Sequence, residues 1–247
     1  AGALTDWYWG EGANDTVYAL ALGPGNTTLY VGGEFTGISS VSRNHLARLQ
    51  ASGSASVDSW NPDVTGAAVK SLLLADTTLY VGGDYTAVSG TSRMNLAAVN
   101  TGTAAVLSWN PQPNGRVDAI ARSVNDANAT IYIGGSFNGV YDSDDYDYVA
   151  AVRPSGYTGE GDPILTSWRV GPDALTSALA ANATGVVVGG NFTRFYLGTS
   201  RIRYYSGVAR FDLDQTPPVA TMKINDDAPS TTTRTVTLRN TASGEVA

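Results

Sequence analysis

The chain has 247 residues, of which 43% are hydrophobic and 15% are charged, and it has a formal net charge of −7 and no cysteine. The acidic balance and the lack of any basic run argue against nucleic acid or an anionic membrane as a partner, because both reward clustered Lys and Arg. Without Cys there are no disulfides or thiolate metal sites. No apolar stretch approaches the ~20 residues of a membrane span, so membrane insertion is not expected.

The first predicted elements in chain order are four short strands. An apolar strand over Val17–Leu22 is followed by a turn and by a second strand over Thr28–Phe35. His45–Gln50 alternates like a third strand, and Ala55–Trp60 forms a fourth. The second unit repeats this order, and four antiparallel strands in about 50 residues are typical of one propeller blade.

A glycine doublet marks the repeat. The segment LYVGGEFT (29–36) returns as LYVGGDYT (79–86), IYIGGSFN (131–138) and VVVGGNFT (186–193). Trp7, Trp60, Trp109 and Trp168 recur in the same phase. We expect the doublet to permit close backbone approach and a strand bulge, and the aromatic residues to fill the space between blades. A helical repeat is disfavoured, because the doublets would interrupt every helix.

The predicted fold is all-β: a β-propeller of about four four-stranded blades over residues 1–214. Its repeats span about 13–62, 63–111, 112–170 and 171–214. Residues 1–12 supply a closing strand, because ALTDWYW (3–9) resembles ILTSWRV (164–170) and the fourth repeat lacks such a strand. The rival interpretation is a larger ring cut at both sides. Residues 215–247 read as a linker and a partial immunoglobulin-like segment with two strands.

The repeat LYVGGEFTGISSVSRNHLARLQASGSASVDSWNP (29–62) resembles the delta-sixty type of β-propeller repeat, which is found in secreted and surface proteins of bacteria and archaea. The matching motifs are the glycine doublet with its aromatic and Thr, the segment SRNHLARL and the ending in Asp-x-Trp-x-Pro. Repeats three and four depart from the pattern, with YDSDDYDY (141–148) and RFYLGTSRIRYYSG (194–207). The resemblance implies a propeller and no particular reaction.

An acidic loop in the third repeat is a candidate cation site. Its four carboxylates would repel one another unless they are solvated or bridged by a hard cation such as Ca²⁺. The spacing does not follow the EF-hand order, and a solvated loop is the competing interpretation. The candidate ligands are Asp142, Asp144, Asp145 and Asp147.

Asn-x-Ser/Thr sequons mark candidate glycosylation sites. Three of them precede a glycine doublet by six or seven residues, on the expected hairpin tips, where Asn also suits the turn itself. The candidates are Asn26, Asn128, Asn182 and Asn14; Asn191 is a poorer choice, because it lies within the packed motif.

Exposed aromatic and basic residues in repeats three and four form a candidate binding surface for sugar or protein. Plain propeller-face loops are the competing interpretation. The residues concerned are Tyr141, Tyr146, Tyr148, Tyr196, Arg201, Arg203 and Tyr204.

No catalytic residue is predicted. The sequence contains no G-x-S-x-G nucleophile motif that could pair with the single histidine, His45. His45 is therefore expected to be an ordinary surface residue. Glu34 and Asp84 occupy equivalent positions, but Ser136 and Asn191 fill the other two, so a structural role is preferred over glycoside hydrolysis.

The sequence therefore favours a non-enzymatic extracellular module of a cell-surface or fibre-forming protein, in contact with protein or carbohydrate. Two alternatives stay open: a polysaccharide-acting hydrolase or lyase, and a filament subunit that self-associates through its C-terminal strands. The chain begins at Ala1 without Met, so either a signal peptide has been removed or the sequence is a piece of a longer protein.

Overall fold

The computed structural model describes residues 12–51, 56–123, 129–141, 143–144, 146–156, 165–166, 168–197, 201–204, 206–213, 220–224 and 238–242. Contacts divide the chain into two compact units, Ala1–Phe211 and Asp212–Ala247. The expected closing strand at residues 1–12 lies outside the described residues, except for its last residue. Almost all of the regular structure described is β, as the sequence predicts.

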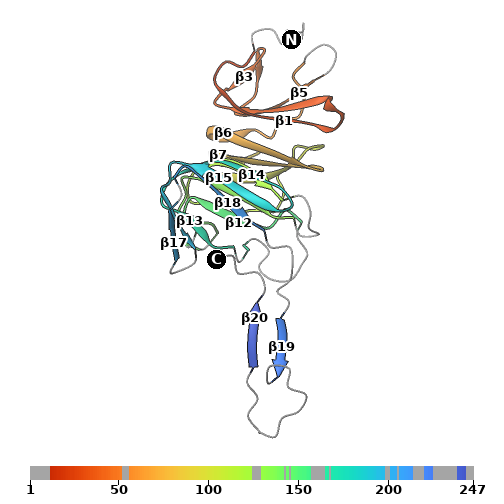
Figure 1. Cartoon of the computed structure of the whole chain (residues 1–247). Coiled ribbons are helices and arrows are strands. Elements are labelled where there is room, and N and C mark those ends of the chain that lie inside the picture. Colours follow the sequence, from red (N-terminus) through yellow and green to blue (C-terminus); the bar gives the residue numbers. More distant parts are fainter. Residues whose placement is uncertain are drawn as a thin grey trace, which may run out of the picture. The chain divides into compact units, whose positions relative to one another are not determined.

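The first two blades follow the predicted strand order (Figure 1). Blade 1 contains β1 (Val17–Leu22), β2 (Thr28–Gly33) and β5 (Leu46–Gln50), which pair in the order β1-β2-β5. A short 3-10 turn, Pro24–Asn26, joins β1 to β2. Blade 2 contains β6 (Val64–Ala75), β7 (Thr78–Val88) and β9 (Leu96–Asn100), with β7 in the middle.

Blades 3 and 4 repeat this arrangement. Blade 3 contains β10 (Val117–Arg122), β11 (Ile131–Gly135) and β12 (Val149–Val152). Blade 4 contains β14 (Thr176–Ala181), β15 (Gly185–Gly190) and β18 (Val208–Asp212). The first strands of successive blades pack in series, β1 on β6, β6 on β10 and β10 on β14. They are therefore the innermost strands of a propeller.

The fourth strand of each blade is shorter than expected. It is reduced to a single antiparallel bridge in the first three blades, between Leu49 and Val57, Val99 and Val106, and Val152 and Leu165. The segment from Gly37 to Ser42, expected as a loop, instead forms a small hairpin of β3 (Gly37–Ile38) and β4 (Val41–Ser42). In blade 2, β8 (Thr91–Ser92) pairs with the end of β7 in the same way.

The segment of the fourth repeat that departs from the pattern, residues 194–207, also forms strands. There, β16 (Arg194–Leu197) and β17 (Arg201–Tyr204) form a sheet with β13 (Val170–Pro172). In the second unit, β19 (Ala220–Ile224) pairs with β20 (Leu238–Ala242). The two strands of this hairpin therefore pair with each other within one chain.

The second glycine of each doublet is required by a close backbone approach. A Cβ added at Gly33, Gly83, Gly135 or Gly190 would lie 1.9–2.1 Å from a carbonyl oxygen of the innermost strand segment. At the same place the register of each innermost strand shifts, between Val17 and Ala19 in blade 1. The same shift occurs in the other three blades. The expected close approach and bulge are thus both present.

A residue in the left-handed backbone region completes each doublet. In blade 1, His45 has φ 62°, its N–H donates to Phe35 O at 2.8 Å, and its carbonyl accepts from Gly33 N at 3.0 Å. Asn95, Tyr148 and Gly207 have positive φ and make the same two hydrogen bonds in the other blades. This four-fold backbone clamp fixes the end of the central strand. It needs a left-handed residue that the sequence pattern alone did not mark.

Tryptophan from each outgoing segment seals the joint to the next blade. Trp60 meets the ring of Tyr30 edge-on at 5.2 Å, and its Nε1 donates to the carbonyl of Asn100 in blade 2 at 3.1 Å. Trp109 repeats this with Tyr80 and with the carbonyl of Arg153 in blade 3. Trp168 lies between the rings of Tyr132 and Phe211. The predicted role of these residues between blades is confirmed.

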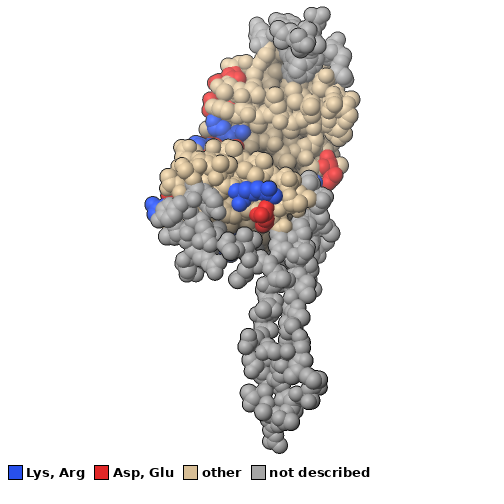
Figure 2. Space-filling model, viewed as in Figure 1, with Lys and Arg blue, Asp and Glu red and all other residues tan. Residues whose placement is uncertain are grey.

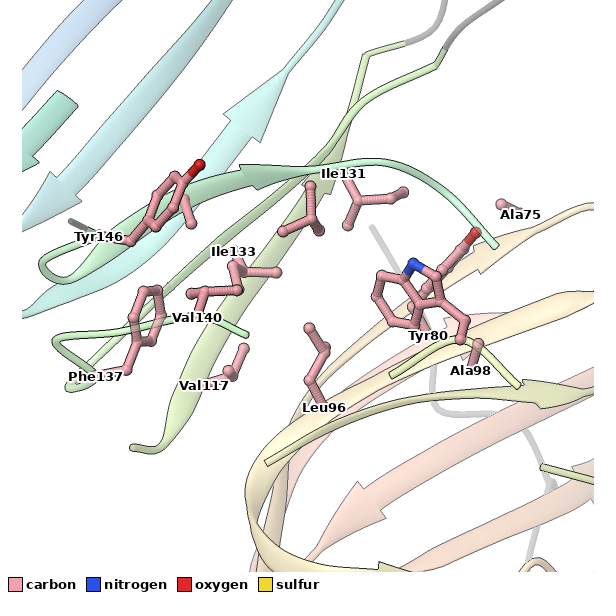
Figure 3. Packing of buried hydrophobic residues seen from close by; sticks show 13 residues of the cluster. Ala75, Tyr80, Leu96, Ala98, Val117, Ile131, Ile133, Phe137, Val140 and Tyr146 are labelled. Carbon is pink, nitrogen blue, oxygen red and sulfur yellow. The ribbon is translucent and has the colours of Figure 1, made fainter. Parts of the chain in front are cut away.

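The cores consequently run across the joints and not only within the blades. Figure 3 shows one cluster in which Leu96 of blade 2 lies opposite Val117 and Ile133 of blade 3, while Ala98 of blade 2 lies next to Tyr80. Tyr80 lies beside an indole at one side of this cluster, and Phe137 and Tyr146 lie at the other. A second cluster joins blades 1 and 2 through Tyr30, Leu46, Trp60, Val69, Val81 and Tyr85.

Candidate functional site

Two positions beside the joints between blades carry chemically different residues from one blade to the next. One is the residue at the bulge of each innermost strand: Tyr18, Lys70, Asp118 and Ser177. The other directly follows the glycine doublet: Glu34, Asp84, Ser136 and Asn191. The bulge pairs with the glycine doublet in every blade, so both sets lie at the same end of the sheets.

At the joint between blades 1 and 2, three of these side chains contact one another. Glu34 Oε1 accepts a hydrogen bond from the Tyr18 hydroxyl at 2.7 Å and pairs with Lys70 Nζ at 3.3 Å. Lys70 Nζ also lies 3.4 Å from the centre of the Tyr18 ring, a cation–π contact. The Lys70 side chain is 20% exposed and that of Glu34 is 38% exposed, so the group is partly open to solvent.

A second group continues around the axis. Arg116 binds Asp118 with two nitrogens, Nε to Oδ1 at 2.7 Å and Nη2 to Oδ2 at 3.2 Å. The hydrogen bonds that Arg116 donates to Asp118 raise the pKa of Arg116, and electrostatic interactions with Asp84 and Tyr18 add to the effect. Arg116 of blade 3 is therefore within electrostatic reach of blades 1 and 2. We call these two groups together the hub cluster: Tyr18, Glu34, Lys70, Asp84, Arg116 and Asp118.

The hub cluster can bind polar groups, but two of its acids are already engaged. Glu34 pairs with Lys70 and Asp118 pairs with Arg116. A glycosidase instead needs one carboxylic acid held protonated beside a second carboxylate. A phenol, carboxylates and cations side by side supply donors, acceptors and an aromatic ring, which is the chemistry of sugar or peptide recognition.

Tight hairpin turns lie at the same end of the sheets as the hub cluster. Ser39 and Ser40, Ser89 and Gly90, and Tyr141 occupy equivalent positions with positive φ. In blade 1 the turn is tied down by Asn14, whose Oδ1 accepts from Thr36 N and Gly37 N at 3.0 and 3.1 Å. A hollow of about 350 Å³ lies there, lined by Gly12, Asn14, Gly37, Ser39 and Ser40.

In the fourth repeat, Asp173 accepts backbone hydrogen bonds at the position equivalent to Asn14 of blade 1. It accepts from Thr193 N at 2.8 Å, and its other oxygen pairs with Arg194 Nε at 3.0 Å. The hydrogen bond from Thr193 and those from Arg194 lower the pKa of Asp173 far below its usual range. The Thr of the motif therefore anchors the loop that precedes its blade.

The acidic loop is only partly described. Asp142 and Asp145 lie outside the described residues, while Asp144 is exposed. Partial burial raises the pKa of Asp147. Among the residues that the structure describes, no cluster of three or more His, Cys, Asp or Glu could hold a metal ion. The Ca²⁺ site stays a prediction.

One residue of the predicted aromatic surface, Tyr146, is buried and not exposed. Tyr146 is only 1% exposed, its hydroxyl donates to Thr166 O at 3.0 Å, and Arg169 covers its ring at 4.1 Å. Tyr146 is therefore a core residue, which packs in the same cluster as Phe137 and Val140 of blade 3. Tyr141 and Tyr196 are exposed, and Tyr148 takes part in the backbone clamp. The side chains of Arg201, Arg203 and Tyr204 lie outside the described part.

The candidate glycosylation sites separate into two groups. Asn26 and Asn182 are exposed in the turns that join the first and second strands of blades 1 and 4, at the end of the sheets opposite the hub cluster. Asn128 lies outside the described residues. Asn14 differs, because its Nδ2 donates to Thr36 Oγ1 at 3.0 Å and a glycan there would break this bond. His45, expected at the surface, is 8% exposed and serves the backbone clamp.

Sequence reasoning missed Tyr18, Lys70, Arg116 and Asp118. The available signal was the repeat itself, since Tyr18, Lys70 and Asp118 stand one place after Val17, Val69 and Val117. Charged side chains are sparse on the visible face in Figure 2, and acidic and basic atoms mostly adjoin one another there. Among the described residues, no helix has the length and hydropathy to cross a membrane.

Repeated antiparallel blades, packed on one another through their innermost strands and joined by tryptophan, define a β-propeller module. A family model described as the Rax2 C-terminal beta propeller domain matches residues 6–158, which is more than half of the chain. The chain belongs to this family. No curated protein matches it.

Proposed function

We propose that this propeller is a non-enzymatic extracellular module of a cell-surface or fibre-forming protein, which contacts carbohydrate or protein through the end that carries the hub cluster. The observation that supports this most is the pairing of Glu34 with both Tyr18 and Lys70. This group combines a ring, a carboxylate and an ammonium at one partly exposed place, and each of them can exchange its present partner for a ligand.

The positions of the sequons agree with this proposal. Asn26 and Asn182 lie at the opposite end of the sheets, so sugar attached there would leave the hub cluster uncovered. The lack of cysteine is compatible with a secreted bacterial or archaeal protein. As part of the same proposal, we assign the repeats to the delta-sixty type and the second unit to the start of an immunoglobulin-like domain.

Carbohydrate binding is tested by affinity electrophoresis through gels that contain neutral or acidic polysaccharides, with reducing ends measured on the same mixtures. The expected result is retarded migration without release of reducing ends. Tyr18→Ala should abolish the retardation. Asp76→Asn, in the β6–β7 turn at the opposite end, should leave it unchanged.

Two results would contradict the proposal. Release of reducing ends that Glu34→Gln abolishes would establish the hydrolase alternative, because that carboxylate would then be part of the chemistry. Retardation that persists in Tyr18→Ala would place the binding surface elsewhere on the molecule. If no polysaccharide retards the protein, carbohydrate is not its ligand.

A further inference from the structure

At each joint between blades, the first glycine of the doublet packs closely against side chains of the next blade. A Cβ added at Gly32 would lie 2.5 Å from Val69 Cγ1 and 3.5 Å from Leu72 Cδ1 of the next blade. At Gly82 it would meet Val117 Cγ1 at 2.7 Å and Ile120 Cδ1 at 3.0 Å. At Gly134 the next blade supplies Thr176 and Leu179. At each joint, therefore, a glycine of one blade contacts two side chains of the next blade, which are three residues apart in the sequence.

Blade 1 presents the two protruding side chains without a receiving glycine among the described residues. Val17 and Leu20 have the registers of Val69 and Leu72, since they pair with the second glycine and with the valine before the doublet. Val69 is 0% exposed, whereas Val17 is 41% exposed and Leu20 is 62% exposed. Leu22, two residues further on, is 57% exposed. We call Val17, Leu20 and Leu22 the leading face.

Blade 4 presents the receiving half of the joint, also uncovered. The doublets of the first three blades are buried, but Gly189 and Gly190 are partly exposed. The nearest atoms to a Cβ at Gly189 belong to Ala178 and Gly207 of the same blade. Val208 is 60% exposed, whereas the equivalent Leu46 and Leu96 are 0% exposed. We call Val187, Gly189 and Val208 the trailing face.

The two faces are complementary halves of a contact that the chain already makes three times. We propose that the leading face of one copy of this chain docks on the trailing face of a second copy, in register with the internal joints. Both faces are exposed in the part of the chain that the structure describes. The pair is heterologous, so assembly is head to tail and yields a ring or an open filament.

The polar residues at this new joint are compatible with it. At the first internal joint, Lys70 of the incoming blade meets Glu34. The equivalent pair at the new joint is Tyr18 and Asn191. A phenol and an amide can hydrogen-bond, and they bring no like charges together in a chain of net charge −7. This inference depends on the blade geometry and not on the proposed ligand.

Sedimentation velocity over a concentration series tests the proposal, with Leu20→Asp and Val208→Asp as variants and Met94→Asp as the control. All three side chains are exposed, but Met94 lies between β8 and β9 and belongs to neither face. The wild type and Met94→Asp should associate. Each face variant should weaken association at least tenfold, because it buries an unpaired charge. A wild type that stays monomeric at its highest soluble concentration would overturn the proposal.

Mixing the two variants distinguishes a head-to-tail joint from a symmetric one. Leu20→Asp retains an intact trailing face and Val208→Asp retains an intact leading face. Their mixture should therefore form dimers and nothing larger. If each variant alone dimerises as well as the wild type, the joint lies elsewhere and the proposal is wrong.

The cysteine-free chain also permits a direct distance test. At the internal joint, the added Gly32 Cβ lies 3.2 Å from Val69 Cβ, close to the roughly 3.5–4.5 Å between the Cβ atoms of a disulfide. Val17→Cys/Gly189→Cys should therefore oxidise to disulfide-linked multimers. A disulfide within one chain would show instead that the four blades close on themselves. No disulfide at all would show that the two faces do not meet.

Discussion

The indole of Trp60 donates a hydrogen bond to the carbonyl of Asn100, across the boundary between blade 1 and blade 2. Because Trp60 belongs to the end of one repeat and Asn100 to the outer strand of the next, this bond joins neighbouring blades at their outer rims. Asp58 beside it accepts from Trp60 N at 2.8 Å and from Arg48 Nη2 at 2.7 Å. The outgoing segment is therefore fixed at both its backbone and its ring.

Trp60→Ala should lower the free energy of unfolding by about 3–5 kcal/mol, because it leaves a cavity in a joint where the ring is 3% exposed. Trp60→Phe keeps most of the packing and loses the hydrogen bond to Asn100, so it should cost less, about 1–2 kcal/mol beyond the lost area. Urea unfolding followed by circular dichroism measures both. Equal losses in the two variants would show that the hydrogen bond and not the packing dominates.

Gly83→Ala should cost about 3 kcal/mol, at the upper end of overpacking substitutions, because its Cβ would lie 2.1 Å from the carbonyl oxygen of Ala68. Gly171→Ala is the matched control, since the nearest atom to its Cβ is Asp147 Cβ at 3.8 Å. The control should change the urea midpoint little. If Gly83→Ala is as stable as the control, backbone approach does not explain the doublet.

His45→Asn should retain stability within about 0.5 kcal/mol of the wild type, because Asn95 occupies the equivalent left-handed position in blade 2. His45→Val should lose about 1–2 kcal/mol or more, since a β-branched residue resists positive φ. Thermal unfolding of the two variants at equal concentration separates these outcomes. A stable His45→Val protein would exclude a role for backbone conformation at this site.

Stability should fall in acid, partly through Asp58. Burial alone would raise the pKa of Asp58, but the hydrogen bonds from Trp60 N and Arg48 outweigh burial and lower it. A carboxyl whose folded pKa lies below its unfolded value of about 3.9 stabilises the protein above that pH, and this contribution disappears as the pH falls through the folded pKa. Urea midpoints between neutral pH and acid should therefore decline.

Asp58→Asn supplies the control for this pH dependence. It removes the titrating group and keeps the shape, so the variant should be less stable at neutral pH and lose less stability on acidification. A variant whose decline in acid matches that of the wild type would assign the effect to other carboxyls, such as Asp173.

The sequence predicted the parts of the fold that depend on local pattern. The period of the doublets and tryptophans yields four blades, and Val17–Leu22 was placed with its correct bounds because its apolar run ends at a Gly-Pro-Gly turn. The fourth strands were over-predicted, because side-chain alternation in segments such as Ala55–Trp60 does not show how few ladder bonds form.

The candidate site was harder to predict, for a physical reason. Side-chain direction in a strand alternates, but a bulge inserts one residue and reverses the alternation of the residues beyond it. Lys70 and Asp118 stand at these bulges, so strict alternation along the strand does not assign them to one face. Tyr146 was placed on the surface because it stands among acidic residues, and only tertiary packing shows that its ring fills a core position.

The residue at the bulge of each innermost strand stands outside the apolar pair that packs on the glycine of the neighbouring blade. The glycine doublet, the backbone clamp and the paired apolar side chains around it hold the scaffold, whatever residue stands at the bulge. Tyr18, Lys70, Asp118 and Ser177 differ completely in charge and size on one shared backbone. A propeller built this way can change the residue at the bulge one blade at a time while the glycine doublet, the backbone clamp and the apolar pairs stay the same.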